Sequence, residues 1–205
     1  MVIKYLDMMK LLIATNNQGK VLEYQELLRG LPFELVTLAQ VGITNVIEEN
    51  GVTMRQNAIL KASGYAALSH LLTIADDSGL EVDALDGAPG IMSARYAGPK
   101  ANDADRINYL LTKLKNVPED KRTARFRCVI AIATAEGKIF TRTATCEGVI
   151  TLAPRGEQGF GYDPVFYFPK FGKTMAELPI NLKNNISHRG KAARKARLVL
   201  KQLAE

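Results

Sequence analysis

Two neighbouring carboxylates follow an apolar run in the first half of the chain. Ala75-Asp76-Asp77-Ser78-Gly79 comes directly after residues 71–75, which we predict to be a buried strand. The carboxyl ends of strands are where α/β proteins usually bind ligands. Successive side chains on an extended backbone point in opposite directions, so we expect one aspartate to enter a site and the other to support it. An aspartate at a turn or a helix cap would give the same pattern, and this motif alone leaves both explanations open.

A second acidic pair, Glu48-Glu49, precedes Gly51. Mg²⁺ selects carboxylate oxygens, commonly one or two of them together with substrate phosphates. By itself the pair is typical of solvated surface. A metal site therefore requires that one of these glutamates converge on Asp77.

A polar loop, Thr15-Asn16-Asn17-Gln18-Gly19-Lys20, separates a predicted strand at 11–14 from a predicted helix at 20–28. Free backbone N–H groups and the helix dipole favour an anion at such a helix start. The loop is not a Walker A motif, because Ala14 stands where the first glycine should be and Val21 where the Mg-binding Ser or Thr should be. Taken alone, it fits an ordinary turn better than a phosphate site.

Two later segments carry aromatic and basic residues. Phe160-Gly161-Tyr162-Asp163-Pro164 is a glycine-spaced loop that can bring a ring close to a planar ligand, although an aromatic anchor in the core would give the same pattern. Ser187-His188-Arg189-Gly190 opens the last predicted helix, with Ser187 as its cap. We expect His188 and Arg189 to donate to an electron-rich group rather than to act as acid or base. His70, at the end of a helix, is assigned a structural role.

Periodicity and capping signals predict the elements that position these segments. Further helices are expected from the capping box at 53–56, over 103–115 with Asn102 or Asp103 as the cap, and at the C-terminus. Alternating residues around the Glu136-Gly137 turn predict a hairpin of 125–134 with 138–146, and residues 165–168 predict another strand. This order of elements points to an α/β fold with a mixed β-sheet and allows two lobes around a cleft.

Composition excludes several classes of protein. With 205 residues, 47% of them hydrophobic and 23% charged, the chain resembles an ordinary soluble globular domain, and we expect one compact unit. Its apolar stretches are far shorter than the roughly 18 residues of a membrane helix, and the first ten residues contain no segment of signal-peptide length. We therefore expect a cytoplasmic protein with no membrane partner. Cys128 and Cys146 lie in apolar runs and are predicted to be buried, reduced thiols.

The formal charge of +6 arises entirely in the C-terminal segment from Lys183 onward. Such a basic segment suits a polyanion, either the phosphates of a small molecule or a nucleic-acid backbone. A solvated helix face is the simpler explanation.

The motifs together, in their order, resemble the inosine triphosphate pyrophosphatase family, also called Ham1-like or non-canonical purine NTP pyrophosphatases. The resemblance runs from about Leu11 to about Leu203. Its motifs are Thr15-x-Asn17-x-x-Lys20, Glu48-Glu49-x-Gly51, Asn57-Ala58-x-x-Lys61-Ala62, Ala75-Asp76-Asp77-Ser78-Gly79-Leu80, Gly87-Ala88-Pro89-Gly90-x-x-Ser93-Ala94-Arg95-Tyr96, Gly159-Phe160-Gly161-Tyr162-Asp163-Pro164, and Lys183 with Ser187-His188-Arg189-Gly190. Family members often carry Phe and Glu where Met54 and Gln56 stand. Residues 1–7 precede the usual start and are expected to be an N-terminal extension of a single two-lobed domain.

The resemblance implies Mg-dependent hydrolysis of ITP, dITP or XTP to the nucleoside monophosphate and pyrophosphate. It also implies an elongated mixed sheet flanked by helices, in two lobes with a central active-site cleft, and a homodimer. By similarity, Glu48 and Asp77 would bind Mg²⁺, and Asp77 would activate the attacking water. The substrate would be contacted by Thr15, Asn16, Asn17, Gln18, Gly19, Lys20, Ser78, Phe160, Gly161, Tyr162, Asp163, Lys183, His188 and Arg189.

Two rival functions remain open at this stage. A nucleic-acid-binding module could use the basic segment, but its aromatic residues are not interleaved with the charges and the acidic motifs would be unexplained, so we expect no nucleic-acid partner. Another Mg-dependent phosphohydrolase could use paired aspartates after a strand, and it would release phosphate rather than pyrophosphate.

Overall fold

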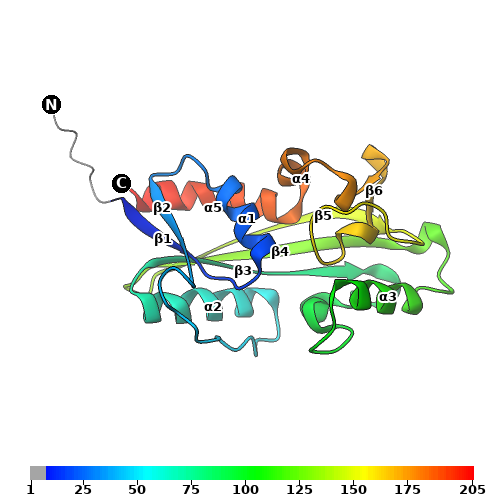
Figure 1. Cartoon of the computed structure of the whole chain (residues 1–205), viewed down its shortest axis with the longest axis horizontal. Coiled ribbons are helices and arrows are strands. Elements are labelled where there is room, and N and C mark those ends of the chain that lie inside the picture. The colour runs from blue at the N-terminus through cyan, green and yellow to red at the C-terminus, as the bar shows by residue number, and fades with distance from the viewer. Residues whose placement is uncertain (1–7) are drawn as a thin grey trace. The chain divides into compact units, whose positions relative to one another are not determined.

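A computed structural model describes residues 8–205 of the chain, and the predicted N-terminal extension, residues 1–7, lies outside the described residues. Seven strands form one sheet in the order β2-β1-β3-β4-β5-β6-β7 (Figure 1). The strands are β1 (Met9–Ile13), β2 (Phe33–Thr37), β3 (Leu72–Val82), β4 (Thr123–Ala133), β5 (Ile139–Ile150), β6 (Phe166–Phe168) and β7 (Lys173–Thr174). The α-helices are α1 (Gln18–Leu27), α2 (Met54–Ser69), α3 (Asp103–Lys113), α4 (Ile180–Ile186) and α5 (His188–Leu203).

The sheet is mixed, as predicted for this α/β fold. Strand β1 pairs in parallel with both β2 and β3, whereas β6 pairs antiparallel with β5 and β7. None of the helices in residues 8–205 is long and apolar enough to cross a bilayer.

The chain divides into two compact units. The first unit contains the residues up to Asp77 together with 129–143 and 192–205, and the second contains 78–128 and 144–191. Strands β3, β4 and β5 and helix α5 contribute residues to both units. Along β3, the division falls between Asp77 and Ser78.

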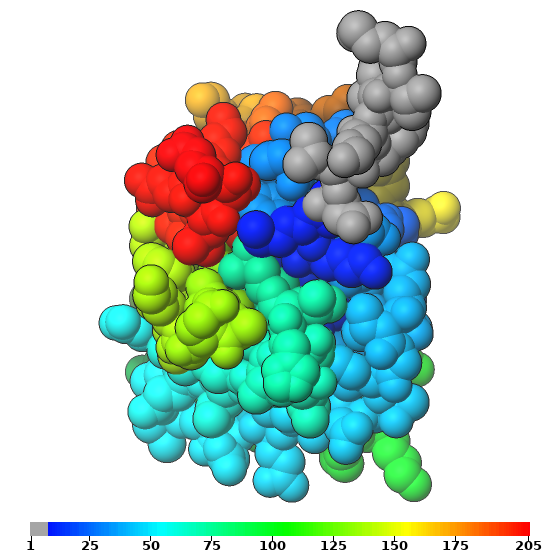
Figure 2. Space-filling model, turned by 90° about the vertical axis from the view of Figure 1, so that its left-hand side faces the viewer, coloured from blue at the N-terminus to red at the C-terminus, as the bar shows by residue number. Residues whose placement is uncertain are grey.

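The first unit is built around β1, whose residues Leu11, Leu12 and Ile13 are buried. Helix α2 covers one face of its strands, and α1 with the C-terminal part of α5 covers the other (Figure 1). Ala192, Ala196, Val199 and Leu200 of α5 are buried, and Arg197 donates to the carbonyls of Leu27 and Arg29 at the end of α1. On the surface of this unit, the end of α5 lies next to the β4–β5 turn (Figure 2).

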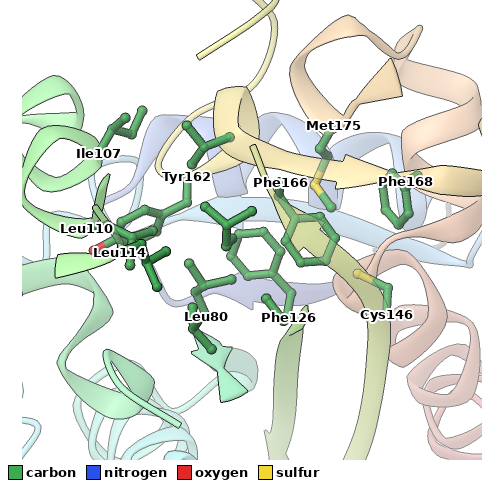
Figure 3. Packing of buried hydrophobic residues seen from close by; sticks show 14 of the residues in the cluster. Leu80, Ile107, Leu110, Leu114, Phe126, Cys146, Tyr162, Phe166, Phe168 and Met175 are labelled. Carbon is green, nitrogen blue, oxygen red and sulfur yellow. The ribbon is translucent and has the colours of Figure 1, made fainter. Parts of the chain in front are cut away.

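The second unit has an aromatic core. Phe126 on β4 and Phe166 on β6 lie with ring centroids 4.7 Å apart, and α3 adds its buried residues Ile107 and Leu110 (Figure 3). Cys146 on β5 belongs to the same cluster and, like Cys128, is a buried thiol outside any disulfide, as predicted.

Capping residues explain where several helices begin. The Asn17 side chain accepts from the Lys20 nitrogen, so α1 starts two residues before the predicted position. Asn102 and Asp105 form a reciprocal capping box at α3. At the start of α5, the Ser187 hydroxyl accepts from the Gly190 nitrogen, which confirms the predicted cap. The hairpin of β4 and β5 is also confirmed.

The predicted end of the central strand was wrong. β3 does not stop at Ala75 but continues to Val82, so Asp76 and Asp77 lie inside a strand rather than after it. Leu80 and Val82 are fully buried on either side of the less buried Glu81, which continues the strand beyond the polar motif. A turn or helix-cap role for the two aspartates is therefore excluded.

Candidate active site

The two aspartates of β3 point to opposite faces of the first unit. Asp76 accepts a hydrogen bond from Lys20 Nζ on α1 at 3.0 Å, and its side chain is fully buried. Asp77 accepts one from Asn57 Nδ2 on α2 at 3.2 Å. Because α1 and α2 cover opposite faces (Figure 1), the alternation predicted from an extended backbone is confirmed.

The Asp77 carboxylate is held in an environment that disfavours its charge. Burial raises the pKa of Asp77 above its ordinary value, and this effect outweighs the neighbouring Lys61, which lowers the pKa. Glu49 raises the pKa further, whereas Lys20 and the Asn57 hydrogen bond lower it. A desolvated carboxylate next to a second one gains when a cation arrives.

The two glutamates before Gly51 differ in exposure: one side chain is in solvent and the other is half-buried. Glu48 is exposed, whereas Glu49 is half-buried and its carboxylate accepts from Lys61 Nζ at 2.8 Å. Glu49 is thus the glutamate that the structure brings toward Asp77. The assignment of Glu48 as a metal ligand stays a prediction.

Carboxylate oxygens are the donors that Mg²⁺ prefers, and the surroundings of Asp77 fit such an ion. Among residues 8–205, no group of three or more His, Cys, Asp and Glu side chains is placed to hold a metal. Mg²⁺ commonly uses only one or two protein carboxylates, because substrate phosphates and water complete its shell. The buried Asp77, with a glutamate near it, supplies that smaller set.

The predicted phosphate loop is an exposed turn that leads into α1. The Asn17 nitrogen donates to Thr15 Oγ1 at 3.2 Å, and Asn16, Asn17 and Gln18 are exposed. Gly19 and Lys20 are half-buried. The Lys20 ammonium points into the protein and forms an ion pair with Asp76.

In the second unit, cations surround the ring of Phe160. Lys183 Nζ lies 5.0 Å from the ring centroid, and the Arg189 guanidinium carbon lies 5.5 Å from it. One oxygen of Asp163 accepts from Lys183 Nζ at 2.6 Å and from the Phe160 nitrogen at 3.0 Å. A side chain at Gly159 would place its Cβ 2.1 Å from that oxygen, so this position requires glycine.

Arg189 and Ser78 complete this group, whereas Tyr162 lies elsewhere. Arg189 is 2% exposed and donates through Nη2 to Ser78 Oγ at 2.9 Å. Tyr162 is buried in the core and its hydroxyl donates to the Ser93 carbonyl, so the anchor explanation holds for this ring. The Gly161 nitrogen donates to Asp103 at the start of α3.

His188 is fixed by two side chains that the sequence did not point to. Its ring stacks on Phe126 with centroids 4.6 Å apart and planes within 11° of parallel. Its Nδ1 lies 3.8 Å from Cys146 Sγ. Burial raises the pKa of the Cys146 thiol to about 12, so the thiol stays protonated and serves as a neutral neighbour of the imidazole.

The functional side chains form two sets, one in each unit. The acidic set of the first unit is Lys20, Glu49, Asn57, Lys61, Asp76 and Asp77. The aromatic set of the second unit is Ser78, Phe160, Asp163, Lys183, His188 and Arg189. Sequence reasoning left open whether Glu48 or Glu49 converges on Asp77, and it assigned no role to Asn57 or Lys61, although their spacing by four residues places them on one face of a helix.

A mixed α/β sheet whose central strand carries buried carboxylates, with lysines and a helix start beside them, defines a class of protein suited to phosphorylated ligands. The chain belongs to the Ham1 family, whose sequence model matches residues 11–198.

Relatives and solved structures agree with this assignment. The dITP/XTP pyrophosphatase of Desulforamulus reducens is 52% identical over 195 residues, which cover 95% of this chain and 97% of that protein. The dITP/XTP pyrophosphatase of Geobacter sulfurreducens is 49% identical, covering 90% of this chain and 93% of its own length. The structure of a HAM1 protein from Coxiella burnetii matches with a TM-score of 0.85 and 41% identity, over 95% of this chain and all of that one (100%).

Proposed function

We propose that this chain is a Mg-dependent pyrophosphatase that hydrolyses non-canonical purine nucleoside triphosphates, namely dITP, XTP and ITP. The bond cleaved is the one between the α- and β-phosphates, and the products are the nucleoside monophosphate and pyrophosphate. The observation that carries the proposal is the buried Asp77 with its acidic set, in a chain about half identical to proteins named dITP/XTP pyrophosphatases.

Asp77 would take the central role in the acidic set. When bound, Mg²⁺ would polarise a phosphoryl oxygen or lower the pKa of a water molecule. Asp77 would hold the ion with a glutamate of the acidic pair, which the resemblance gives as Glu48, whereas Glu49 is the one whose charge acts on Asp77 in the structure. The Asp77 carboxylate would accept the proton of the attacking water. In the metal-free chain burial raises the pKa of Asp77, and a bound cation would favour its ionised form.

Lysines of both sets would bind phosphate without leaving their aspartates. A lysine ammonium has three N–H donors. Lys20 can therefore keep its bond to Asp76 while it donates to a phosphate oxygen. Because Asp76 holds the ammonium in place, less side-chain freedom is lost when the substrate binds. Lys183, held by Asp163, would act in the same way.

The aromatic set would select the base. Phe160 can stack on any purine, so it contributes affinity with little selectivity. His188 and Arg189 as donors suit the 6-oxo group of hypoxanthine or xanthine, whereas adenine presents a 6-amino donor and leaves them without acceptors. Sites that recognise a substrate by hydrogen bonding reject a mismatched analogue by about 10⁴ or more. Guanine also carries a 6-oxo group, so rejection of GTP needs a further feature.

A panel of nucleoside triphosphates, assayed with separate detection of phosphate and pyrophosphate, tests this function. With Mg²⁺ we expect ITP to give IMP and pyrophosphate and ATP to be a poor substrate. Asp77→Asn should abolish turnover while circular dichroism shows an intact fold. Equal rates on ITP and ATP would refute the proposed specificity, and release of phosphate would favour a different phosphohydrolase.

A further inference from the structure

Helix α2 holds the segment that carries the acidic pair, residues 45–51, through one of its faces. Three side chains spaced by four residues contact positions of this acidic segment in reverse order. The contacts are Tyr65 Oη donating to the Asn45 carbonyl at 3.1 Å, Lys61 Nζ donating to Glu49 at 2.8 Å, and Asn57 Oδ1 accepting from the Gly51 nitrogen at 2.8 Å. From Asn57 to Lys61 the helix advances by about 6 Å, and from Gly51 to Glu49 two extended residues span about 6.6 Å, so these two spacings match.

Glycines permit the close approach of the acidic segment to α2. A Cβ at Gly64 would lie 2.9 Å from Ile47 Cδ1. A Cβ at Gly51 would lie 2.7 Å from Asn57 Oδ1. The acidic segment is therefore held against α2 by hydrogen bonds and close packing at several points along its length.

Of the three α2 side chains that contact the acidic segment, Asn57 also contacts strand β3. It is 1% exposed, and its Nδ2 donates to Asp77 Oδ2 at 3.2 Å. The partners determine the orientation of the amide, because the Gly51 N–H can only donate and a carboxylate oxygen of Asp77 accepts. One buried amide thus connects the acidic segment to the carboxylate on β3.

We propose that Asn57 is a positioning residue of this hydrolase, which orients the Asp77 carboxylate and couples it to the acidic segment that carries Glu48 and Glu49. The inference rests on the proposed function, since it concerns how the Mg-binding carboxylates are arranged. Side chains that orient metal ligands typically change metal affinity or activity about 10–100-fold when they are mutated. Asn57 contributes no metal ligand of its own.

Gln56 provides a matched control. Its Oε1 accepts from the Val52 nitrogen at 2.8 Å, the same distance as the bond from the Gly51 nitrogen to Asn57. Gln56 is exposed on α2, and the hydrogen bond that the structure gives its side chain leads to the loop rather than to β3. Gln56→Ala therefore removes a comparable bond to the chain before α2 without removing the donor to Asp77.

Two Asn57 variants separate positioning from packing. Asn57→Ala removes both hydrogen bonds of the amide. Asn57→Asp keeps its shape and the acceptor for the Gly51 nitrogen but replaces the donor to Asp77 with a second carboxylate. A purely structural role of Asn57 predicts that Asn57→Asp changes stability but keeps the Mg²⁺ response of the wild type, and a positioning role predicts that the Mg²⁺ response changes as well.

The measurements are the Mg²⁺ concentration for half-maximal ITP hydrolysis and the rise in unfolding temperature caused by magnesium chloride alone. We expect Asn57→Ala to need about 10–100-fold more Mg²⁺ and to show a smaller rise in unfolding temperature, Asn57→Asp to depart from the wild type in both measurements, and Gln56→Ala to match the wild type. Wild-type behaviour of Asn57→Asp, or equal losses in Gln56→Ala and Asn57→Ala, would overturn the proposal.

A second variant covers the case in which the Asn57 variants do not fold. Gly51→Ala leaves Asn57 in the chain but pushes on its Oδ1, and we expect the same loss of Mg²⁺ response. An unchanged response in a folded Gly51→Ala protein would count against the coupling. The unfolding measurement uses no nucleotide, so it decides the role of Asn57 even if the wild type proves not to hydrolyse ITP.

Discussion

Asp77 is the residue on which the proposed chemistry depends, and its burial has a cost for the fold. Desolvation disfavours the carboxylate anion, and Glu49 adds to this effect. The group is retained in a position where it destabilises the folded chain at neutral pH. Such a cost is common where a buried group serves function rather than stability.

The raised pKa of Asp77 predicts how an amide at this position changes stability with pH. Below the ordinary value of 3.8 the carboxyl is protonated in both the folded and the unfolded chain. As pH rises, the unfolded chain ionises first, and the folded chain loses stability until the pH passes the raised pKa. With Mg²⁺ removed by a chelator, Asp77→Asn should therefore raise the unfolding temperature at pH 7 and have little effect below the ordinary pKa.

Asp83 provides a control of the opposite sign. Its pKa is lowered, chiefly by the hydrogen bond from Thr123 and also by Arg125, so its ionised form stabilises the folded state above the ordinary pKa and loses that effect as pH falls. Asp83→Asn should lower the unfolding temperature at pH 7. Thermal unfolding across a pH series checks both variants, and a loss of stability in Asp77→Asn at pH 7 would contradict the assigned burial cost.

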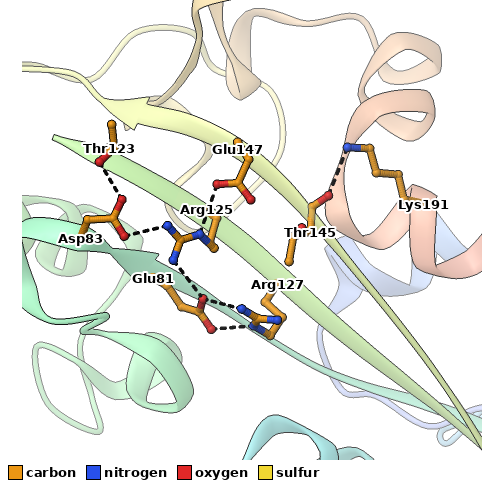
Figure 4. Close-up of polar contacts among 8 residues, drawn as sticks. All are labelled: Glu81, Asp83, Thr123, Arg125, Arg127, Thr145, Glu147 and Lys191. Carbon is orange, nitrogen blue, oxygen red and sulfur yellow. Dashed lines mark hydrogen bonds and ion pairs between the residues drawn. The ribbon is translucent and has the colours of Figure 1, made fainter. Parts of the chain in front are cut away.

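At the scale of elements, two arginines show how burial decides the value of a polar contact. Arg122 is 3% exposed and donates to the carbonyls of Leu114, Val117 and Thr151. It thus caps the end of α3 and binds the chain after β5. Arg125 instead lies on the strand surface between Asp83 and Glu147 (Figure 4).

Arg122→Met should destabilise the fold much more than Arg125→Met does. The first change removes three hydrogen bonds that a buried guanidinium makes to carbonyls, and we expect a loss of about 3 kcal/mol, or roughly 6–12 °C in the unfolding temperature. The second removes exposed ion pairs, for which about 1 kcal/mol or less is expected. Urea unfolding of both variants checks the difference, and equal losses would show that the exposed network contributes more than its solvent exposure suggests.

The lysines of α5 explain part of the basic C-terminal segment. Lys191 donates to the Thr145 carbonyl and Lys195, one turn later, donates to that of Thr143, so both bind backbone oxygens of β5 (Figure 4 shows the first). Lysine side chains that cover the carbonyls at the edge of a strand hinder pairing of that strand with another chain. The positive charge at this end of the sequence therefore has a structural use that composition could not distinguish from binding of a polyanion.

At the scale of the whole molecule, the two candidate sets of side chains lie in different units. The acidic set belongs to the first unit and the aromatic set to the second, and the backbone passes from one to the other between Asp77 and Ser78. Neighbouring residues of one strand thus belong to sets that we propose to handle phosphate and base.

We also propose that the chain forms a homodimer, from its resemblance to the pyrophosphatase family. Size-exclusion chromatography with light scattering should then give twice the monomer mass of 22.5 kDa at assay concentrations. A mass of one chain, with full activity on ITP, would refute this prediction without affecting the proposed chemistry.

The sequence by itself determined the class of the fold, the main helices and the hairpin, because these depend on periodicity and caps within contiguous residues. It also singled out the segments that carry the candidate site residues. It misplaced the end of β3, because a polar motif inside a buried strand resembles the end of that strand. The positions of Leu80 and Val82 show why the strand continues.

Only the tertiary structure decided how these residues are partnered. The pairs Lys20–Asp76 and Asn57–Asp77 join positions 56 and 20 residues apart, and Lys183–Asp163 joins positions 20 apart. It also turned Glu49 toward Asp77 and left Glu48 exposed. Such contacts depend on which faces of helices and strands pack together, and this packing cannot be predicted from short stretches of sequence.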